Sequence, residues 1–526
     1  MKFMEQDITR RQALVSAAVV GAGLVAGCGS SGGGGTTATG AGAAAAQRRR
    51  GGVIRVAGSG SGSSETLDPV SYVSGNINNC RFIAIYNQLV RMGPGITPQL
   101  EIAESMEPNA DATEWTIRLH RGVEWHDGKP FTAKDVLYSF NRLNDPRYPN
   151  YVGNKVALAN FRAAKVMDDV TLRVPMHQSF SGFMETLTYG FWVVQDGMKD
   201  FTKTAVGTGP YRVQSFSPGE VCVVVPNANY WGSVGPFADR MELRSIADVQ
   251  ARLNAFQAGE IDVAMDLGSQ ASRLAAGLPG HIVTSQKLTA YYFMMDMSRK
   301  PFDDPRVVQA FKLACDRNAM NANLQNGRGV VGQDLFFMAP GSEGYPTDWP
   351  TPPYDPQQAK RLLAEAGYPN GLSVTMEAIT GYPDMINLCQ LYAQQAKAAG
   401  ITVKVNSTPE DKFYSDVWGK TPFFGDYGGP NVSSQVLAGR VTGNGNNVSH
   451  FSSARYDKDF AALERATTKA ARAPIYARLV DELRSDGTLT PLWFNGYDLV
   501  SDKVQGWGPA NSLWARQDMA GLAISA

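Results

Sequence analysis

The sequence predicts a protein of the α/β class, in which strands and helices alternate along the chain. Segments with period-two apolar alternation interleave with segments of helical apolar spacing from residue 53 to residue 494. The 526 residues suffice for about three domains at roughly 150 residues each. With 43% hydrophobic and 19% charged residues, the composition is that of a globular protein and excludes wholesale disorder.

Each element follows from its local pattern. Thr132 with Asp135 forms a capping signature, and Pro305 suits a first helical position, so both predict helix starts. Alternation predicts strands at 53–57, 115–119, 170–174, 211–216, 222–225, 372–376, 401–405 and 489–494. Helical spacing predicts helices at 79–91, 132–143, 248–259, 305–317, 355–367, 385–399, 456–472 and 474–484. In such a fold, ligands bind in crevices at the carboxyl ends of strands.

The first 27 residues have the pattern of an export signal. An apolar stretch of 14 residues, Ala13 to Ala26, follows a charged segment and is shorter than the about 20 residues of a membrane-spanning helix. Arg10 and Arg11 precede it, which favours the twin-arginine route over general secretion. The stretch before Cys28 resembles the lipobox of bacterial lipoproteins, which implies lipidation of Cys28. Residues 28–51, rich in Gly, Ser, Thr and Ala, are then expected to form a flexible tether.

Charge and cysteine content narrow the function classes. Lys+Arg and Asp+Glu are both 49, so the chain lacks the basic excess typical of a nucleic-acid-binding protein. No C-x-x-C pair is present, which argues against zinc or thioredoxin-type chemistry. Spacing leaves the disulfide state open, and buried free thiols are the default expectation for Cys80, Cys222, Cys315 and Cys389.

No catalytic constellation emerges from the motifs. The one G-x-S-x-G, at residues 29–33, lies in the tether, and there is no Walker A loop and no H-E-x-x-H. The five histidines are scattered; His120 and His126 flank a turn and are expected to have a plain surface role rather than to bind metal. We therefore expect a binding protein, not an enzyme, with no metal or cofactor.

Six short motifs run in order through the chain, at residues 65–69, 119–136, 207–211, 258–262, 301–310 and 354–367. The most specific is the long one around His126-Asp127-Gly128-Lys129-Pro130-Phe131-Thr132-Ala133. Together they resemble the extracytoplasmic solute-binding proteins of peptide- and nickel-type ABC importers, solute-binding protein family 5. Their glycines, prolines and caps also have a purely structural interpretation, so they indicate the fold without marking ligand contacts.

The resemblance implies a two-lobe periplasmic-binding-protein fold (type II, cluster C) with an extra subdomain on lobe one. Two chain crossings then form a hinge, and ligand stabilises the closed state. The implied boundaries are 52–88, 205–292 and 488–526 for lobe one, 89–204 for the extra subdomain and 293–487 for lobe two.

The resemblance also points to Asp426 as the ligand's partner. In peptide-binding members an aspartate in a W-x-x-D-x-x-[DE]-P stretch pairs with the peptide α-ammonium. Here Asp426 and Pro430 match, whereas Phe423 replaces the Trp and Gly429 replaces the acid. The alternative is that Asp426 merely caps a loop. Six further residues are expected to line the cleft: Phe424, Tyr427, Tyr292, Met295, Asp296 and Trp493.

A second departure concerns the far end of the ligand. In dipeptide-binding members of the family, a basic residue after a second-lobe strand holds the ligand's carboxylate. The corresponding residues here, 378–384, include no basic residue. This favours a longer peptide or another amine-bearing solute. The leading hypothesis is capture of an oligopeptide and its delivery to an ABC permease by a monomer that is lipid-anchored on the outer face of the cytoplasmic membrane. The alternatives are a receptor for a metal chelate, oligosaccharide or antibiotic, and, more remotely, a secreted hydrolase.

Overall fold

The computed structural model describes residues 48–525, except 71–75, 146, 148–152, 383 and 511–516. The expected signal segment, the twin arginines and Cys28 lie outside the described residues.

The largest element is a mixed 11-stranded sheet with the order β15-β14-β16-β12-β17-β11-β1-β10-β9-β8, in which β13 also pairs with β17. Its strands are β1 (Val53–Gly58), β8 (Tyr211–Ser217), β9 (Val221–Pro226), β10 (Arg240–Ser245), β11 (Val263–Leu267), β12 (His281–Met295), β13 (Val330–Val331), β14 (Leu372–Ile379), β15 (Ile401–Thr408), β16 (Phe423–Gly428) and β17 (Thr488–Val500).

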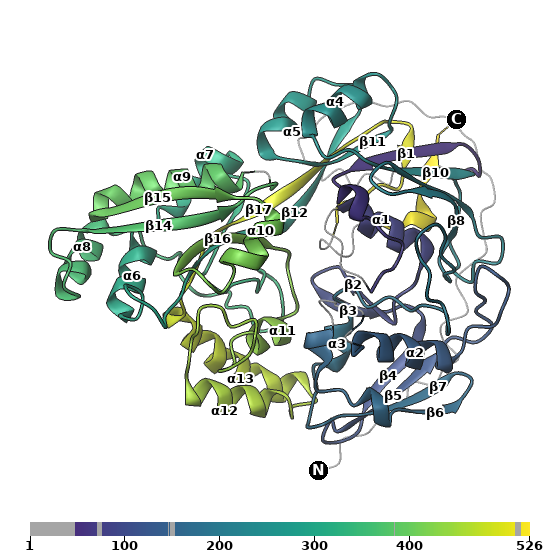
Figure 1. Ribbon diagram of the computed structural model, residues 1–526, viewed down its shortest axis with the longest axis horizontal. Helices are drawn as coiled ribbons and strands as arrows, with labels where there is room; N and C mark the ends of the chain where they lie inside the picture. Colours follow the sequence, from purple (N-terminus) through teal and green to yellow (C-terminus); the bar gives the residue numbers. More distant parts are fainter. Residues whose placement is uncertain are drawn as a thin grey trace, which may run out of the picture. The chain divides into compact units, whose positions relative to one another are not determined.

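Two long antiparallel strands join the two halves of this sheet. β12 and β17 pair from His281↔Val500 to Met294↔Thr488, with register shifts on the way. Strands β11, β1, β10, β9 and β8 extend the sheet from β17, whereas β16, β14 and β15 extend it from β12 (Figure 1). The crossings implied near residues 292 and 488 therefore fall on the two strands that run through both halves.

Helices pack on both halves of the sheet. α1 (Asn76–Ile85), α4 (Val249–Gln257) and α5 (Ser269–Ala275) accompany the half with β1. The other half carries α6 (Pro305–Leu313), α7 (Arg317–Gln325), α8 (Pro356–Glu365), α9 (Met385–Ala396), α10 (Glu410–Lys412), α11 (Ser433–Ala438), α12 (Ala454–Leu463) and α13 (Lys469–Glu482). As expected, α6 begins at Pro305; Asp304 caps α6 and Asp355 caps α8, accepting from the backbone N–H of Arg306 (2.9 Å) and Gln358 (2.8 Å).

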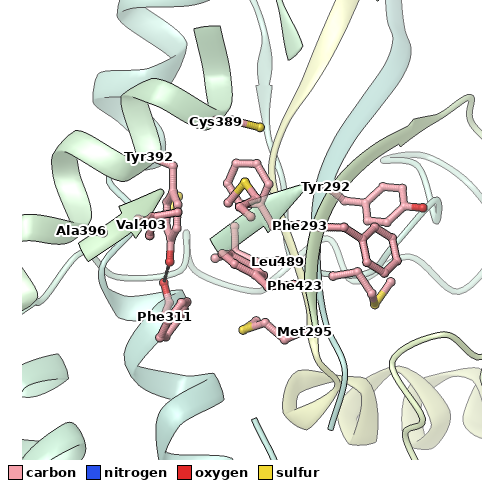
Figure 2. Packing of buried hydrophobic residues seen from close by; sticks show 14 of the residues in the cluster. Tyr292, Phe293, Met295, Phe311, Cys389, Tyr392, Ala396, Val403, Phe423 and Leu489 are labelled. Atoms are coloured by element: carbon pink, nitrogen blue, oxygen red, sulfur yellow. Dashed lines mark hydrogen bonds between the residues drawn. The ribbon is translucent and has the colours of Figure 1, made fainter. Parts of the chain in front are cut away.

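The core of the second half shows why β16 and β12 are so apolar. The Phe423 ring lies 5.4 Å from Phe302 and 5.5 Å from Phe311, and the Tyr392 hydroxyl donates to the Phe311 carbonyl at 3.0 Å (Figure 2). Burying an aromatic or aliphatic side chain of this size contributes about 1.5–3 kcal/mol. Alternate residues of β16 thus anchor the strand in the core and leave the others for its opposite face.

Residues 89–204, called the inserted segment below, contain a separate four-stranded sheet of order β4-β5-β7-β6. Its own apolar cluster includes Trp115, Phe140 and Phe183. The elements are β2 (Val90–Gly93), β3 (Thr97–Leu100), β4 (Ala103–Pro108), β5 (Glu114–Leu119), α2 (Ala133–Leu143), β6 (Lys165–Asp168), β7 (Thr171–Pro175) and α3 (Phe183–Leu187). Two short strands, β18 (Val504–Gln505) and β19 (Ala523–Ile524), pair near the C-terminus.

His126 joins two of the family-like stretches, so its expected surface role is wrong. Its Nδ1 accepts the Gly207 N–H at 3.1 Å, and its Nε2 donates to the Gly209 carbonyl at 3.0 Å. Burial lowers the pKa of His126 to about 4, so the ring is neutral as these contacts require. A Cβ on Gly207 would lie 1.8 Å from the Ile85 carbonyl oxygen. The two motifs therefore fix how the inserted segment meets the neighbouring β1 half.

Two predicted helices end differently in the structure. The helix expected at 79–91 ends at Ile85, because Gln88 bridges to Trp192 and Val90 begins β2. The break expected at Pro474 falls earlier: α12 ends at Leu463, and α13 begins after Thr468, whose side chain accepts from the Ala471 N–H. Tertiary pairing and a better N-cap decided these boundaries.

The cysteine expectation is confirmed for the described residues. Cys80, Cys222, Cys315 and Cys389 are all buried and free. Burial raises the pKa of the Cys222 and Cys315 thiols to about 12, so both stay protonated and unreactive.

Candidate ligand-binding site

The pairing of β16 with β12 decides which side chains share a face of the sheet. Asp426 lies directly opposite Tyr292, and Phe424 lies opposite Met294. Phe423 and Met295 form the next pair, and their side chains point to the other face of the sheet. Asp426 and Tyr292 therefore project together from the face opposite to Phe423 and Met295, although Tyr292 still packs within the apolar cluster of this half.

Asp426 is 2% exposed and receives hydrogen bonds from three groups. The Tyr292 hydroxyl donates to Oδ2 at 2.6 Å. The Tyr414 hydroxyl and the Tyr427 N–H donate to Oδ1 at 3.2 and 2.8 Å. Among the described residues no basic side chain forms an ion pair with Asp426.

Burial without a cation has a clear electrostatic consequence. Desolvation raises the pKa of Asp426 to about 7, although the hydrogen bonds from Tyr292, Tyr427 and Tyr414 lower it. Burial and the neighbouring Asp426 also raise the pKa of Tyr292 well above its ordinary value, so Tyr292 stays a donor. The site thus holds a carboxyl group poised between its two protonation states at neutral pH.

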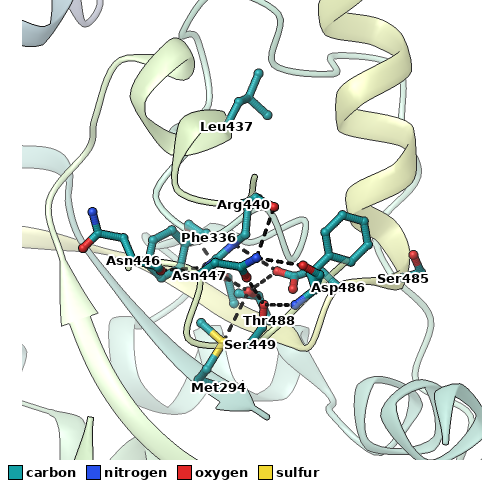
Figure 3. Close-up of polar contacts among 12 residues, drawn as sticks. Met294, Phe336, Leu437, Arg440, Asn446, Asn447, Ser449, Ser485, Asp486 and Thr488 are labelled. Atoms are coloured by element: carbon teal, nitrogen blue, oxygen red, sulfur yellow. Dashed lines mark hydrogen bonds and ion pairs between the residues drawn. The ribbon is translucent and has the colours of Figure 1, made fainter. Parts of the chain in front are cut away.

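A cation does lie near this cluster, but it is paired elsewhere. The Arg440 guanidinium lies 3.9 Å from the centre of the Phe336 ring, which in turn packs edge-on against Tyr292 at 4.8 Å. Arg440 forms an ion pair with Asp486 at 3.3 Å and contacts Thr488 (Figure 3). Its charge is therefore compensated by Asp486, with an aromatic ring between it and Tyr292.

Aromatic side chains continue this face toward β17. The Phe337 ring packs against Tyr292 at 5.0 Å, and a Cβ on Gly428 would come within 2.1 Å of it. Trp493, which pairs with Ala290, clusters with Phe337 and with Ile96 from the inserted segment. The structure thus brings Trp493 and Tyr292 onto the same aromatic face.

Tyr427 lies at the end of β16 and contacts a different group. Its ring stacks on Tyr382 with centroids 3.5 Å apart, and the two hydroxyls are hydrogen-bonded. Tyr382 also donates to Glu410 at 2.6 Å. Tyr427 therefore reaches Asp426 through its backbone and the Tyr382–Glu410 pair through its side chain.

The remaining expected site residues lie apart from Asp426's hydrogen bonds. Phe424 is fully buried against Phe413, at 5.8 Å, and Met295 is fully buried in the core. Asp296 is fully buried and binds His450 at 2.7 Å and Arg299 at 3.0 Å. Their contact with ligand stays a prediction, to which this placement adds no support.

Sequence reasoning missed Tyr414, Tyr382 and the adjacent pair Phe336 and Phe337. None of them lies in a stretch that matches the family pattern, and they come from three separate segments. For all but Tyr382, the signal in the sequence was the density of aromatic residues at 336–337 and 413–427, which is equally typical of a core.

The part of the chain that the structure describes lacks two further features. It contains no cluster of three or more His, Cys, Asp or Glu side chains that could hold a metal ion. None of its helices combines the length and the apolar character needed to cross a membrane.

The fold and this face define a class: a binding protein of two lobes joined by paired strands. Residues 97–438 match the family described as "Bacterial extracellular solute-binding proteins, family 5 Middle". This match covers more than half of the chain, so the protein belongs to this family of extracytoplasmic solute-binding proteins.

Curated relatives agree with this assignment. The chain is 26% identical to heme-binding protein A of Haemophilus influenzae over 486 residues, covering 84% of this chain and 87% of the relative. It is 27% identical to glutathione-binding protein GsiB of Escherichia coli over 362 residues, covering 68% and 70%. These relatives carry the names of binding proteins, not of enzymes.

Solved structures share the fold. The DppA protein of Helicobacter pylori in complex with the peptide STSA superposes with a TM-score of 0.78 at 20% identity, covering 91% of this chain and 99% of that one. The binding protein AgaA of A. tumefaciens R10, in complex with agropinic acid, gives a TM-score of 0.76 at 23% identity, covering 90% and 99%.

Proposed function

We propose that this protein captures an oligopeptide or another solute with a primary ammonium group and delivers it to an ABC permease, with Asp426 as the partner of the ammonium. The observation that carries the proposal is a fully desolvated carboxyl group with three hydrogen-bond donors and no described cation paired to it.

Physical chemistry favours an ammonium group as the missing partner. A buried carboxylate costs several kcal/mol unless a charge compensates it, and a charge-assisted hydrogen bond to a cation contributes about 1.5–3 kcal/mol. The aromatic face formed by Tyr292, Phe337 and Trp493 adds apolar surface and further attraction for a cation. An uncharged ligand would leave the desolvation of Asp426 without compensation.

The comparisons and the sequence bear on whether the solute is a peptide and how long it is. Relatives named for glutathione and structures titled with peptides favour a peptide. The relative named for haem favours the non-peptide alternative, because haem carries no ammonium group. Residues 378–384 contain no basic residue that could hold a carboxylate, which favours a solute longer than a dipeptide.

Calorimetry with matched peptides tests the proposal. The solute that co-purifies with the protein is first identified by mass spectrometry, and a peptide of that length is then compared with its N-acetylated form. We expect N-acetylation to weaken binding by at least about tenfold, whereas amidation of the carboxyl end has a smaller effect. Equal affinities for free and acetylated peptide, or a co-purified solute without an amine, would overturn the role of Asp426.

We also propose that lipid on Cys28 anchors the protein outside the cytoplasmic membrane. Support comes from the sequence alone: the lipobox-like residues before Cys28 and the tether of residues 28–51. Each buried CH₂ of an acyl chain adds about 0.8 kcal/mol of membrane affinity. Cys28→Ala should move the protein from the membrane fraction to the soluble fraction; membrane retention of that variant would contradict the anchor.

A further inference from the structure

Residues 181–187 of the inserted segment lie against three helices from the other end of the sequence. α3 contacts α11, Ser181 just before α3 contacts the C-terminal end of α12, and Glu185 within α3 contacts the first turn of α13. The two halves of the large sheet, to which these two regions belong, are connected along the chain through β12 and β17. The inserted segment is itself held to the β1 half, where Arg142 binds Asp68 at 2.7 Å. The contact therefore bridges the two halves that the paired strands connect.

Backbone groups make the first part of this bridge. The Ser181 N–H donates to the Glu464 carbonyl at 2.9 Å, and the Ser181 hydroxyl donates to the Leu463 carbonyl at 3.1 Å. Both carbonyls belong to the last turn of α12, where carbonyl groups lack partners within the helix. Ser181 thus serves as the C-terminal cap of a helix in the opposite half.

Charged groups make the second part. Glu185 Oε1 forms an ion pair with Arg472 at 2.8 Å, and the Ser434 hydroxyl donates to Glu185 Oε2 at 3.1 Å. Arg472 also donates to the Tyr476 hydroxyl at 2.6 Å and lies 3.4 Å from Glu343. The side chains of Glu185 and Arg472 are only 12% and 11% exposed. Solvent therefore screens this pair little.

This arrangement can exist only while the two halves touch. Glu464 is 3% exposed, and its pKa is raised by burial and by the charge of Glu185 and lowered by that of Arg472. Removing Arg472 leaves the buried carboxylate of Glu185 and the partly buried one of Glu343 without their cation, which is unfavourable while the halves touch. When the halves separate, water solvates the same carboxyl groups, so the open state loses far less.

We propose that Ser181, Glu185, Ser434, Glu464 and Arg472 form a latch between the inserted segment and the second lobe that sets the balance between closed and open protein. Ligand affinity then depends on residues that touch no ligand, because only the closed fraction holds the solute tightly. The latch rests on the closing movement of the family and goes beyond the proposed ligand.

The distance between the two halves tests the latch directly. Spin labels at Met167→Cys in β6 and Lys360→Cys in α8, both exposed positions, report this distance in a Cys28→Ser background, since the other cysteines are buried. Arg472→Met should lower the ratio of short-distance to long-distance populations by about tenfold or more. The readout needs no ligand, so a failure of the latch and a failure of the peptide proposal are distinguishable.

Arg478 provides a matched control on the same helix. It binds Asp459 of α12 at 2.8 Å, within one half of the molecule. Arg478→Met should therefore leave the distance distribution unchanged. Should Arg472→Met fail to fold, Glu185→Gln removes the other partner and should shift the distribution in the same direction. The latch is overturned if Arg472→Met and Glu185→Gln both fold and leave the distance distribution unchanged. It is also overturned if the unsubstituted protein shows no short-distance population.

Discussion

Two buried carboxyl groups of the second lobe differ in how they are compensated. The Arg317 guanidinium donates to both carboxylate oxygens of Asp334, at 2.9 and 2.8 Å, and the Thr490 N–H donates to one of them. Asp426 receives bonds only from hydroxyl groups and a backbone N–H. The first pair is complete within the protein, whereas the second lacks a cation. The difference separates a carboxylate that maintains the fold from one that is suited to receive a charged guest.

The largest effect should come from breaking the complete pair. Arg317→Met leaves Asp334 buried without its cation and should lower the free energy of unfolding by about 3–5 kcal/mol in urea titrations. Arg306, which is half exposed and binds Asp304 at 2.6 Å, is the control. Arg306→Met should cost less than about 1 kcal/mol. Comparable losses for the two variants would remove the distinction.

Asp426→Asn should change the stability of the protein little and its affinity for ligand strongly. The amide keeps a hydrogen-bonding side chain and removes a poorly compensated buried charge, so the free energy of unfolding should change by less than about 1 kcal/mol. Affinity for a free-amine peptide should fall by about tenfold to a hundredfold in calorimetry, since a charge-assisted bond is lost. A strongly destabilised Asp426→Asn protein would mean that Asp426 is structural, like Asp334.

Only one of these two carboxyl groups could be singled out from the sequence. Asp426 could be singled out because it lies in a stretch that matches the family pattern. The pairing of Asp334 with Arg317 could not, because nothing local shows that a residue after β13 meets the start of α7. The starts of α6 and α8, by contrast, were predictable, since a capped helix start depends only on neighbours within four residues.

The pH dependence of binding should sharpen the contrast. The pKa of Asp426 is about 7 without ligand, and an ammonium partner lowers it, so the ionised form binds and protons compete below pH 7. Affinity for a free-amine peptide should be constant above about pH 8 and fall by about tenfold per pH unit well below 7. Asp426→Asn should show a flat profile. A wild-type profile that is equally flat from pH 5 to 8 would contradict the role of Asp426.

The smallest expected effect concerns Glu464 in the latch. Burial and Glu185 raise its pKa to about 8, while Arg472 and the Gly182 N–H lower it. The raised pKa favours the closed state at low pH, and this contribution is lost as pH rises through about 8. The closed population in the spin-label experiment should therefore decrease between pH 7 and 9, and Glu464→Gln should remove the decrease. An unchanged pH response in that variant would assign the effect to another group.

The halves of the molecule were harder to predict than the elements within them. Strand and helix patterns gave β1, β14 and α9 nearly at their observed bounds. They did not give β12 or β16, because β12 continues for 15 residues through two register shifts and β16 contains two glycines. Long-range pairing, not local pattern, determines these two strands, and they carry Tyr292 and Asp426.

The antiparallel pairing of β12 and β17 has a mechanical consequence. Because the two strands are hydrogen-bonded to each other, they behave as one ribbon, and any reorientation of the flanking strands must bend or twist it. The ladder is interrupted between Ser285 and Thr289 and between Tyr291 and Phe293, and Lys287 there has a φ of 54°. Bending should concentrate at these interruptions, which lie a few residues from Tyr292. The stiffness of the paired strands at these points therefore governs how readily the protein samples its conformations.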